Sequence, residues 1–315
     1  MKRIISAMLA VIIMLSLCSC SAKKETALII SGAEINSEIF TYYVDKVVQR
    51  PEDYGLTKES AKKEIKQAAI GLCKEYVAAN TEFRNIGLSL SAADKLKVSD
   101  NVNNFWVRFN NHYEKIGVSK QTLTKILTAE AYQDAIFTAT YDRGVSNKAA
   151  EQELTDYFYS NYISFRTVCA YFTSADGLSE MTQLEKNELT EKFKKLASES
   201  GAELQKFSDA VTAAGYTLSD SILLKKGSDG YPEGFFEKVY EQKDGTVQII
   251  IENDCIFAVW KENLKEKGES VYSSYRSTCI SDLYSADAQK KTDELVAAMT
   301  VDEKRAVDRI VNKMV

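Results

Sequence analysis

The sequence predicts a mainly helical α+β protein. Its 315 residues include only two prolines, Pro51 and Pro232, so long helices meet few forced breaks. Through most of the first half, apolar residues recur at the three- and four-residue spacing of amphipathic helices. Segments 165–172, 246–251 and 255–260 are instead rich in β-branched and aromatic residues, which favour strands. The length suggests two domains or one large one, and 45% hydrophobic residues are enough to build a core.

The amino-terminal residues 1–19 have the features of a signal peptide. Lys2 and Arg3 precede an apolar core that is short for a membrane-spanning helix. The core ends in the letters LCSC, where the small Ser19 stands directly before Cys20. This resembles a bacterial lipobox, which implies cleavage before Cys20 and its lipidation. Two acyl chains give stable anchoring. The alternative is a simple secretory signal with incidental cysteines.

Capping residues divide the next part of the chain into a strand and several helices. We expect a strand at 26–30 and then helices that begin at Asn36 or Ser37, Thr57, Ser91 and Ser119. The first helix should bury an apolar stripe formed by Ile39, Phe40, Tyr43, Val44 and Val47. The stripe expected on the third helix contains Val102, Trp106, Phe109, Tyr113 and Ile116.

The middle of the chain mixes helix and strand. Gly144 should end one helix and Ser146 or Asn147 should cap the next, which carries Leu154, Tyr157, Phe158 and Tyr162 at helical spacing. Helices are expected at 182–200, 203–214 and 232–240, and strands at 165–172, 217–225, 246–251 and 255–260. A long helix at 268–299 and a last helix capped by Asp302 complete the chain.

Several of these segments resemble parts of extracytoplasmic foldases of the PrsA and SurA type. They are AEINSEIF, KIGVSKQTLTKIL, the capped helix that leads into FRTVCAYF, and PEGFFEKVY followed by DGTVQII. The resemblance implies a SurA-N-like helical chaperone lobe formed by 26–145 and 266–315, with a parvulin-like α/β domain inserted at 146–265. Residues 1–19 would be the lipoprotein signal peptide and 20–25 the lipidated tether.

Active parvulins use two histidines on adjacent strands, and the resemblance places Tyr171 and Ile256 at those positions. The whole sequence has one histidine, His112, so a two-histidine site cannot form. We therefore expect a degenerate domain with no catalytic residues, and His112 as a surface or boundary residue. The alternative is an active peptidyl-prolyl isomerase with a divergent site, in which Tyr171 and Cys169 would replace part of the missing network.

No pattern of metal ligands, cofactor binding or nucleophilic catalysis is present, so no metal or cofactor is expected. The net charge of −5 argues against a nucleic-acid partner. Glu151 and Glu153 are expected on a solvated helix face, as are Lys192, Lys194 and Lys195. Beyond Cys18 and Cys20, four cysteines remain, which allow three disulfide pairings, with buried free thiols as the alternative; they are Cys73, Cys169, Cys255 and Cys279.

With catalysis, metal binding and nucleic-acid binding set aside, client binding is the function that the sequence favours. The helical lobe has more aromatic residues than a single buried stripe can accommodate. Neighbouring residues differ by about 100° around a helix, so some members of adjacent pairs should face solvent. Tyr42, Phe105 and Trp106 are the candidates. The predicted protein is a membrane-anchored extracytoplasmic chaperone for unfolded or secreted polypeptides, with a homodimer left open. A surface lipoprotein scaffold without chaperone activity is the third alternative.

Overall fold

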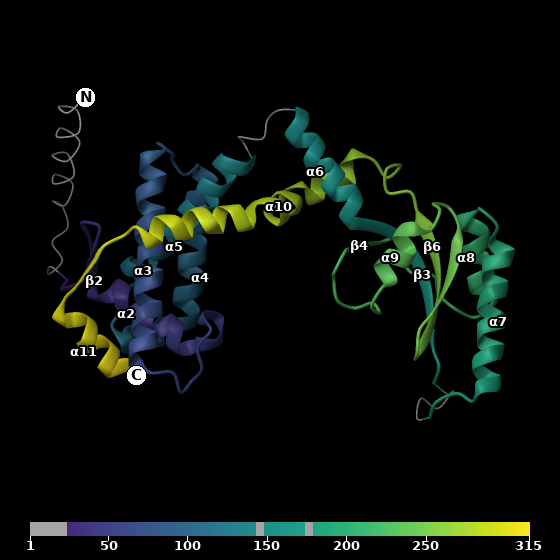
Figure 1. Ribbon diagram of the computed structural model, residues 1–315, viewed down its shortest axis with the longest axis horizontal. Coiled ribbons are helices and arrows are strands. Elements are labelled where there is room, and N and C mark those ends of the chain that lie inside the picture. The colour runs from purple at the N-terminus through teal and green to yellow at the C-terminus, as the bar shows by residue number, and fades with distance from the viewer. Residues whose placement is uncertain (1–23, 143–147, 174–178) are drawn as a thin grey trace. The chain divides into compact units, whose positions relative to one another are not determined.

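The structure is a computed structural model that describes residues 24–142, 148–173 and 179–315. The described residues form two compact units (Figure 1). Among the described residues, the first unit comprises 24–142 and 286–315, and the second comprises 148–173 and 179–285. The mainly helical α+β class predicted from the sequence is confirmed. The return to the helical lobe is predicted at residue 266, whereas the units divide after Ser285, within one long helix.

The first unit combines a small sheet with a set of helices. Its strands β1 (Thr26–Ile30), β2 (Ala33–Asn36) and β7 (Val301–Glu303) pair antiparallel in the order β2-β1-β7. Its helical segments are α2 (Ser37–Gln49), η2 (Pro51–Tyr54), α3 (Lys62–Asn85), α4 (Ala92–Ile116), α5 (Lys120–Phe137), η3 (Thr138–Asp142), the end of α10 (Glu269–Ala297) and α11 (Arg305–Met314). The sheet therefore joins the two ends of the unit's sequence.

Three helices of this unit begin at the predicted capping residues. The Asn36 side chain accepts a hydrogen bond from the Ile39 backbone N–H at 3.0 Å. The Ser91 hydroxyl accepts from the Asp94 N–H at 3.1 Å, and the Ser119 hydroxyl caps α5 in the same way. Each cap provides an acceptor for an N–H that the helix itself leaves unpaired.

Two predicted caps are wrong. Thr57 does not start α3, which begins at Lys62, where the Glu64 carboxylate accepts from the Ala61 N–H at 2.9 Å. Asp302 does not start α11, because it lies in β7 opposite Ile29 of β1. The strand pairing occupies residues 301–303, so the N-cap position of α11 falls at Lys304, whose side chain makes no capping hydrogen bond.

The first unit has a core built from α2, α3, α11 and β1. The five residues of the predicted stripe on α2 are all buried in it. The short helix α11 contributes Ala306, Val307, Ile310 and Val311, which are buried against the same cluster. A ten-residue helix is marginal in isolation, so this packing is what holds α11 in place.

The last two residues of the predicted tether are bound to the first unit. Lys24 forms an ion pair with Glu38 at 2.7 Å, and Glu25 pairs with Arg309. The Glu38 carboxylate also accepts from the hydroxyls of Ser119 and Thr122, each at 2.6 Å. Burial opposes ionisation of Glu38, but Lys24 and these hydrogen bonds outweigh it and lower the pKa of Glu38 to about 2.

The second unit is an antiparallel four-stranded sheet with helices on both faces. Its strands β3 (Tyr162–Tyr171), β4 (Ile222–Lys225), β5 (Val247–Ile251) and β6 (Cys255–Glu262) follow the order β4-β3-β6-β5. Its helices are α6 (Lys148–Asn161), α7 (Gln183–Ser200), α8 (Leu204–Ala213), α9 (Phe235–Glu241) and the first part of α10.

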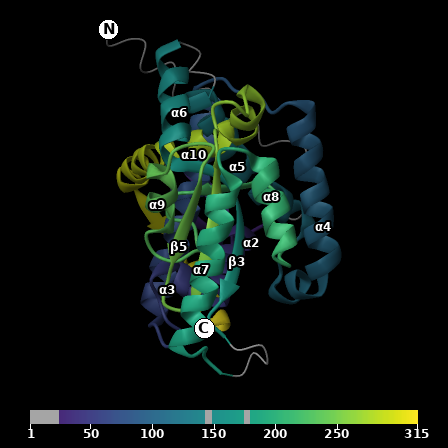
Figure 2. The same cartoon turned by 90° about the vertical axis from the view of Figure 1, so that its right-hand side faces the viewer.

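The apolar residues of strand β6 pack against helices on both faces of the sheet. Ile256, Ala258 and Trp260 pack in the cluster formed with α7, which lies in front of the strands in Figure 2, and α8. Phe257 and Val259 alternate with them and pack in the cluster that includes α9. Because successive strand residues point to opposite faces, an apolar run such as β6 is stable only with both faces buried.

Two predicted boundaries in this unit are wrong. Tyr162, expected at the end of a helix, is the first residue of β3 and lies opposite Lys225. The strand expected at 217–225 is regular only from Ile222. The predicted helix end at Gly144 and the caps at Ser146 or Asn147 lie outside the described residues.

Candidate functional site

The structure does not bring the two predicted parvulin positions to a common site. Tyr171 lies at the end of β3 opposite Cys255, and its side chain is 64% exposed. Ile256 is fully buried on the other face of the sheet, in the cluster with α7 and α8. Adjacent residues of one strand face opposite ways. Since Tyr171 shares a face with Cys255, it cannot share one with Ile256.

The cysteines of the described chain are free. Cys73, Cys255 and Cys279 are buried, and Cys169 is half-buried. Burial raises the pKa of the Cys255 thiol to about 12 and that of Cys279 to about 11, and it also raises the pKa values of Cys73 and Cys169. A thiol is reactive as its thiolate, so none of these groups is poised as a nucleophile.

Two carboxylates of the second unit are structural partners. Glu151 was predicted on a solvated face, but it accepts two hydrogen bonds from Arg276, at 3.1 Å from Nε and 2.9 Å from Nη2. The Tyr272 hydroxyl donates to it at 2.6 Å. Glu153 accepts from the Tyr284 hydroxyl at 3.0 Å. The Glu151 side chain is still 42% exposed, and its partners come from α10 and not from its own helix.

Glu262 has four partners among the described residues of the second unit. It accepts from Arg166 Nε at 3.0 Å, from the Ser164 hydroxyl at 2.7 Å and from the Ser221 hydroxyl at 2.6 Å, and it pairs with Lys267. Burial would raise its pKa, but these donors lower the pKa of Glu262 to about 2. The cluster ties β3 and β6 to the segments next to them, and its side chains satisfy one another.

The predicted client-binding residues differ in exposure. Tyr42 is half-buried between Tyr43 and Tyr113, with ring centroids 5.4 and 6.2 Å away, and burial raises the pKa of its hydroxyl. Trp106 is half-buried and stacks on Tyr113 at 6.2 Å with an interplanar angle of 11°. Phe105 is 43% exposed. Tyr42 therefore belongs to the packed interior, and Phe105 is the accessible member of the set.

Sequence reasoning missed Phe109. It was assigned to the buried stripe of α4, but its side chain is 41% exposed and its ring lies 6.2 Å from that of Phe105. The pair has the spacing of one helical turn, which puts both rings on one side of the helix. We call Phe105, Trp106 and Phe109 the α4 aromatic face. The i, i+4 spacing of the two phenylalanines is the signal that could have found it.

Helix α4 presents this face because it is only lightly packed. Of its 25 residues, only Val98, Val102 and Tyr113 are buried. Two cavities, of about 340 Å³ and 580 Å³, are lined by Val98 and by other residues of α4 and α5. A helix with so little buried surface is held mainly at these few positions, so much of its apolar surface remains available to a partner.

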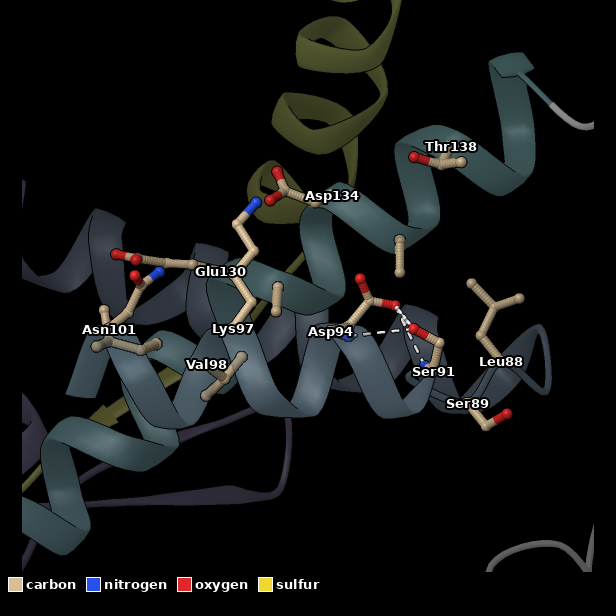
Figure 3. A pocket seen from close by; sticks show the side chains of 13 residues that line it. Leu88, Ser89, Ser91, Asp94, Lys97, Val98, Asn101, Glu130, Asp134 and Thr138 are labelled. Atoms are coloured by element: carbon tan, nitrogen blue, oxygen red, sulfur yellow. Dashed lines mark hydrogen bonds between the residues drawn. The ribbon is translucent and has the colours of Figure 1, made fainter. Parts of the chain in front are cut away.

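The smaller of these cavities is polar (Figure 3). Its walls carry Asp94, Glu130, Asp134 and Lys97, with the capping pair Ser91 and Asp94 at one end. Burial raises the pKa of Glu130, Asp134 adds to this effect and Lys46 opposes it. Among the described residues, no group of three or more His, Cys, Asp and Glu side chains is arranged to hold a metal ion. Charged walls suit this cavity poorly to an apolar ligand.

No helix in the described ranges combines the length and the apolar character needed to cross a bilayer. Cys20 and the rest of the predicted signal peptide lie outside the described residues.

Comparisons with known proteins give similarity only at the level of solved structures. No protein-family model and no curated protein matches the sequence. The chain is similar to the foldase PrsA from Lactococcus lactis, with 12% identity, coverage of 92% of this chain and 99% of that chain, and a TM-score of 0.40. PrsA from Streptococcus pneumoniae shares 11% identity over 90% of each chain, with a TM-score of 0.34.

A peptidylprolyl isomerase, PrsA from Bacillus cereus, gives 12% identity, coverage of 93% of this chain and 99% of that chain, and a TM-score of 0.35. At these identities and TM-scores, the similarity assigns neither a family nor an activity.

Proposed function

We propose that this chain is a lipid-anchored extracytoplasmic chaperone that holds unfolded polypeptides on the α4 aromatic face, without catalysing prolyl isomerisation. The observation that carries the proposed function is the exposure of Phe105 and Phe109, side by side on a lightly packed helix. Single exposed apolar residues are common, but adjacent exposed aromatic rings are a typical docking surface for apolar segments. The leader sequence and the foldase-like motifs are consistent with this role.

The domain assignments follow as part of the same hypothesis. The first unit corresponds to the SurA-N-like helical lobe, and the second to the degenerate parvulin-like domain. Clients would be unfolded or secreted polypeptides, and a homodimer remains open. Purified mature protein should slow the aggregation of a chemically unfolded client at equimolar concentration, measured by light scattering. No effect at that ratio would contradict the chaperone and favour the lipoprotein scaffold.

The rival function, an active prolyl isomerase, makes a different prediction. Uncatalysed isomerisation of a proline peptide takes tens to hundreds of seconds, and we expect the purified mature protein to leave this rate unchanged. The reason is that Tyr171 and Ile256 face opposite sides of the sheet and offer no pair of histidines. A protease-coupled peptide assay measures the rate. Acceleration that survives repurification and disappears in Tyr171→Phe or Cys169→Ala would support the rival.

Anchoring is tested at Cys20. Substitution Cys20→Ala is expected to leave the leader uncleaved or to release the protein from the membrane fraction, because the sulfur that would carry the lipid is gone. Fractionation and metabolic labelling with a fatty acid measure this. Cys18→Ala is the matched control and should be lipidated normally. Label that persists in Cys20→Ala would show that another residue is modified.

A further inference from the structure

A third cavity of the first unit is lined by none of the residues of the α4 aromatic face. It has a volume of about 570 Å³ and is formed by α2, the carboxyl end of α4 and α11. This volume is within the range of small-ligand sites, roughly 300–1,000 Å³. Its apolar lining comes from Val48, Ile116, Ile310 and Met314. This part of the cavity wall is therefore suited to contact an apolar side chain.

Several charged side chains around this cavity already form ion pairs with other residues of the chain. Glu38 is paired with Lys24, and Arg309 is paired with Glu25. Such pairs neutralise each other and leave little net attraction for a ligand.

The remaining acid, Asp45, is buried and is bound by the only histidine of the chain. The His112 Nε2 atom lies 2.8 Å from an Asp45 carboxylate oxygen, and Gln49 donates to the other oxygen at 3.5 Å. The lone histidine is therefore a packing partner that closes one wall of the cavity. Its contact satisfies a carboxylate that would be costly to bury alone.

Two cations of the lining stay unpaired. The ammonium groups of Lys115, in the last turn of α4, and Lys313, in the last turn of α11, have no ion pair or hydrogen bond to any described residue. Both side chains are exposed. Lysine near a helix carboxyl end is favourable in itself, but here two such ends converge on one cavity. The cavity thus combines an apolar lining with two lysines that form no ion pair with a described carboxylate.

We propose that this cavity binds the carboxyl-terminal residue of a peptide that ends in an apolar side chain. The α-carboxylate would lie between Lys115 and Lys313, and the side chain would enter against Ile116 and Ile310. Thr41 and Gln49 also line the cavity and could form hydrogen bonds with the last peptide unit. A fatty acid has no peptide unit and would leave these polar groups without a partner. The site is independent of the proposed chaperone function, because it uses none of the residues of the α4 aromatic face.

The test compares two fluorescein-labelled pentapeptides that end in leucine, one with a free carboxylate and one amidated, by anisotropy with the full mature chain. The free carboxylate is expected to bind about tenfold more tightly, the effect that two exposed ion pairs together can supply. Lys115→Ala/Lys313→Ala should remove this preference, and Lys115→Arg/Lys313→Arg should keep it. Lys63→Ala/Lys125→Ala, at exposed positions on α3 and α5, is the charge-matched control.

Equal affinity for the two peptides, or an unchanged preference in Lys115→Ala/Lys313→Ala, would overturn the assignment. So would direct binding of laurate in a calorimetric titration combined with no peptide binding, which would identify a fatty-acid site. Aggregation assays on the same variants separate this site from the proposed function. The double lysine variant should hold clients as the wild type does, and a variant of the α4 aromatic face should retain peptide binding.

Discussion

Replacing Phe105 and Phe109 together with serine is expected to abolish client holding while the protein stays folded. Both rings are already about three-fifths covered, so a client can bury only their exposed parts. Fully burying one phenylalanine contributes about 1.5–3 kcal/mol, so covering the exposed parts of both rings contributes roughly 2 kcal/mol, or about thirtyfold in affinity. Serine and phenylalanine have similar helix propensities, so α4 should keep its structure.

The measurement is suppression of client aggregation by the full mature chain, alongside the melting temperature by circular dichroism. Leu184→Ser is the matched control, because Leu184 is 68% exposed on α7 of the second unit. It should hold clients normally. Phe105→Ser alone should weaken holding partly. Normal holding by the double variant would show that clients bind elsewhere on the chain.

Neutralising Glu262 is expected to destabilise the second unit by about 2–3 kcal/mol. Glu262→Gln leaves Arg166 and Lys267 without their counter-charge in a site where the Glu262 side chain is only 10% exposed. Breaking a buried ion pair by removing one partner costs about 3–5 kcal/mol, and the partial exposure of the two cations reduces that figure. Urea unfolding followed by Trp260 fluorescence, in a Trp106→Phe background, would report on this unit alone.

The pH dependence of this contribution follows from the lowered pKa. The folded state holds the pKa of Glu262 at about 2, below its ordinary value of 4.5, so folding favours the ionised form. The difference in stability between wild type and Glu262→Gln should be complete above about pH 4.5 and should shrink as the pH falls toward 2. Glu266→Gln, an exposed neighbour, should change stability by less than about 0.5 kcal/mol. A difference that stays constant down to pH 3 would contradict the assignment.

The helices could be predicted closely where their signals are local. Asn36, Ser91 and Ser119 start helices as expected, because a cap depends on the conformation of a few neighbouring residues. The buried stripe of α2 followed from periodicity for the same reason. Predictions from local sequence were wrong where a distant segment forms backbone hydrogen bonds with the same residues. Asp302 is an example, because it pairs with β1 instead of capping α11.

The candidate site shows the same division between local and distant causes. The sequence by itself determined that α4 is a long amphipathic helix rich in aromatic residues, because spacing and composition are properties of the segment. Only the tertiary structure decided which of those residues stay exposed. Phe109 has the right spacing for a buried stripe, but α4 packs mainly on α5, and burial requires a partner surface that spacing cannot supply. Glu262 is similar, because its partner Ser164 is 98 residues away and only the pairing of β3 with β6 brings the two together.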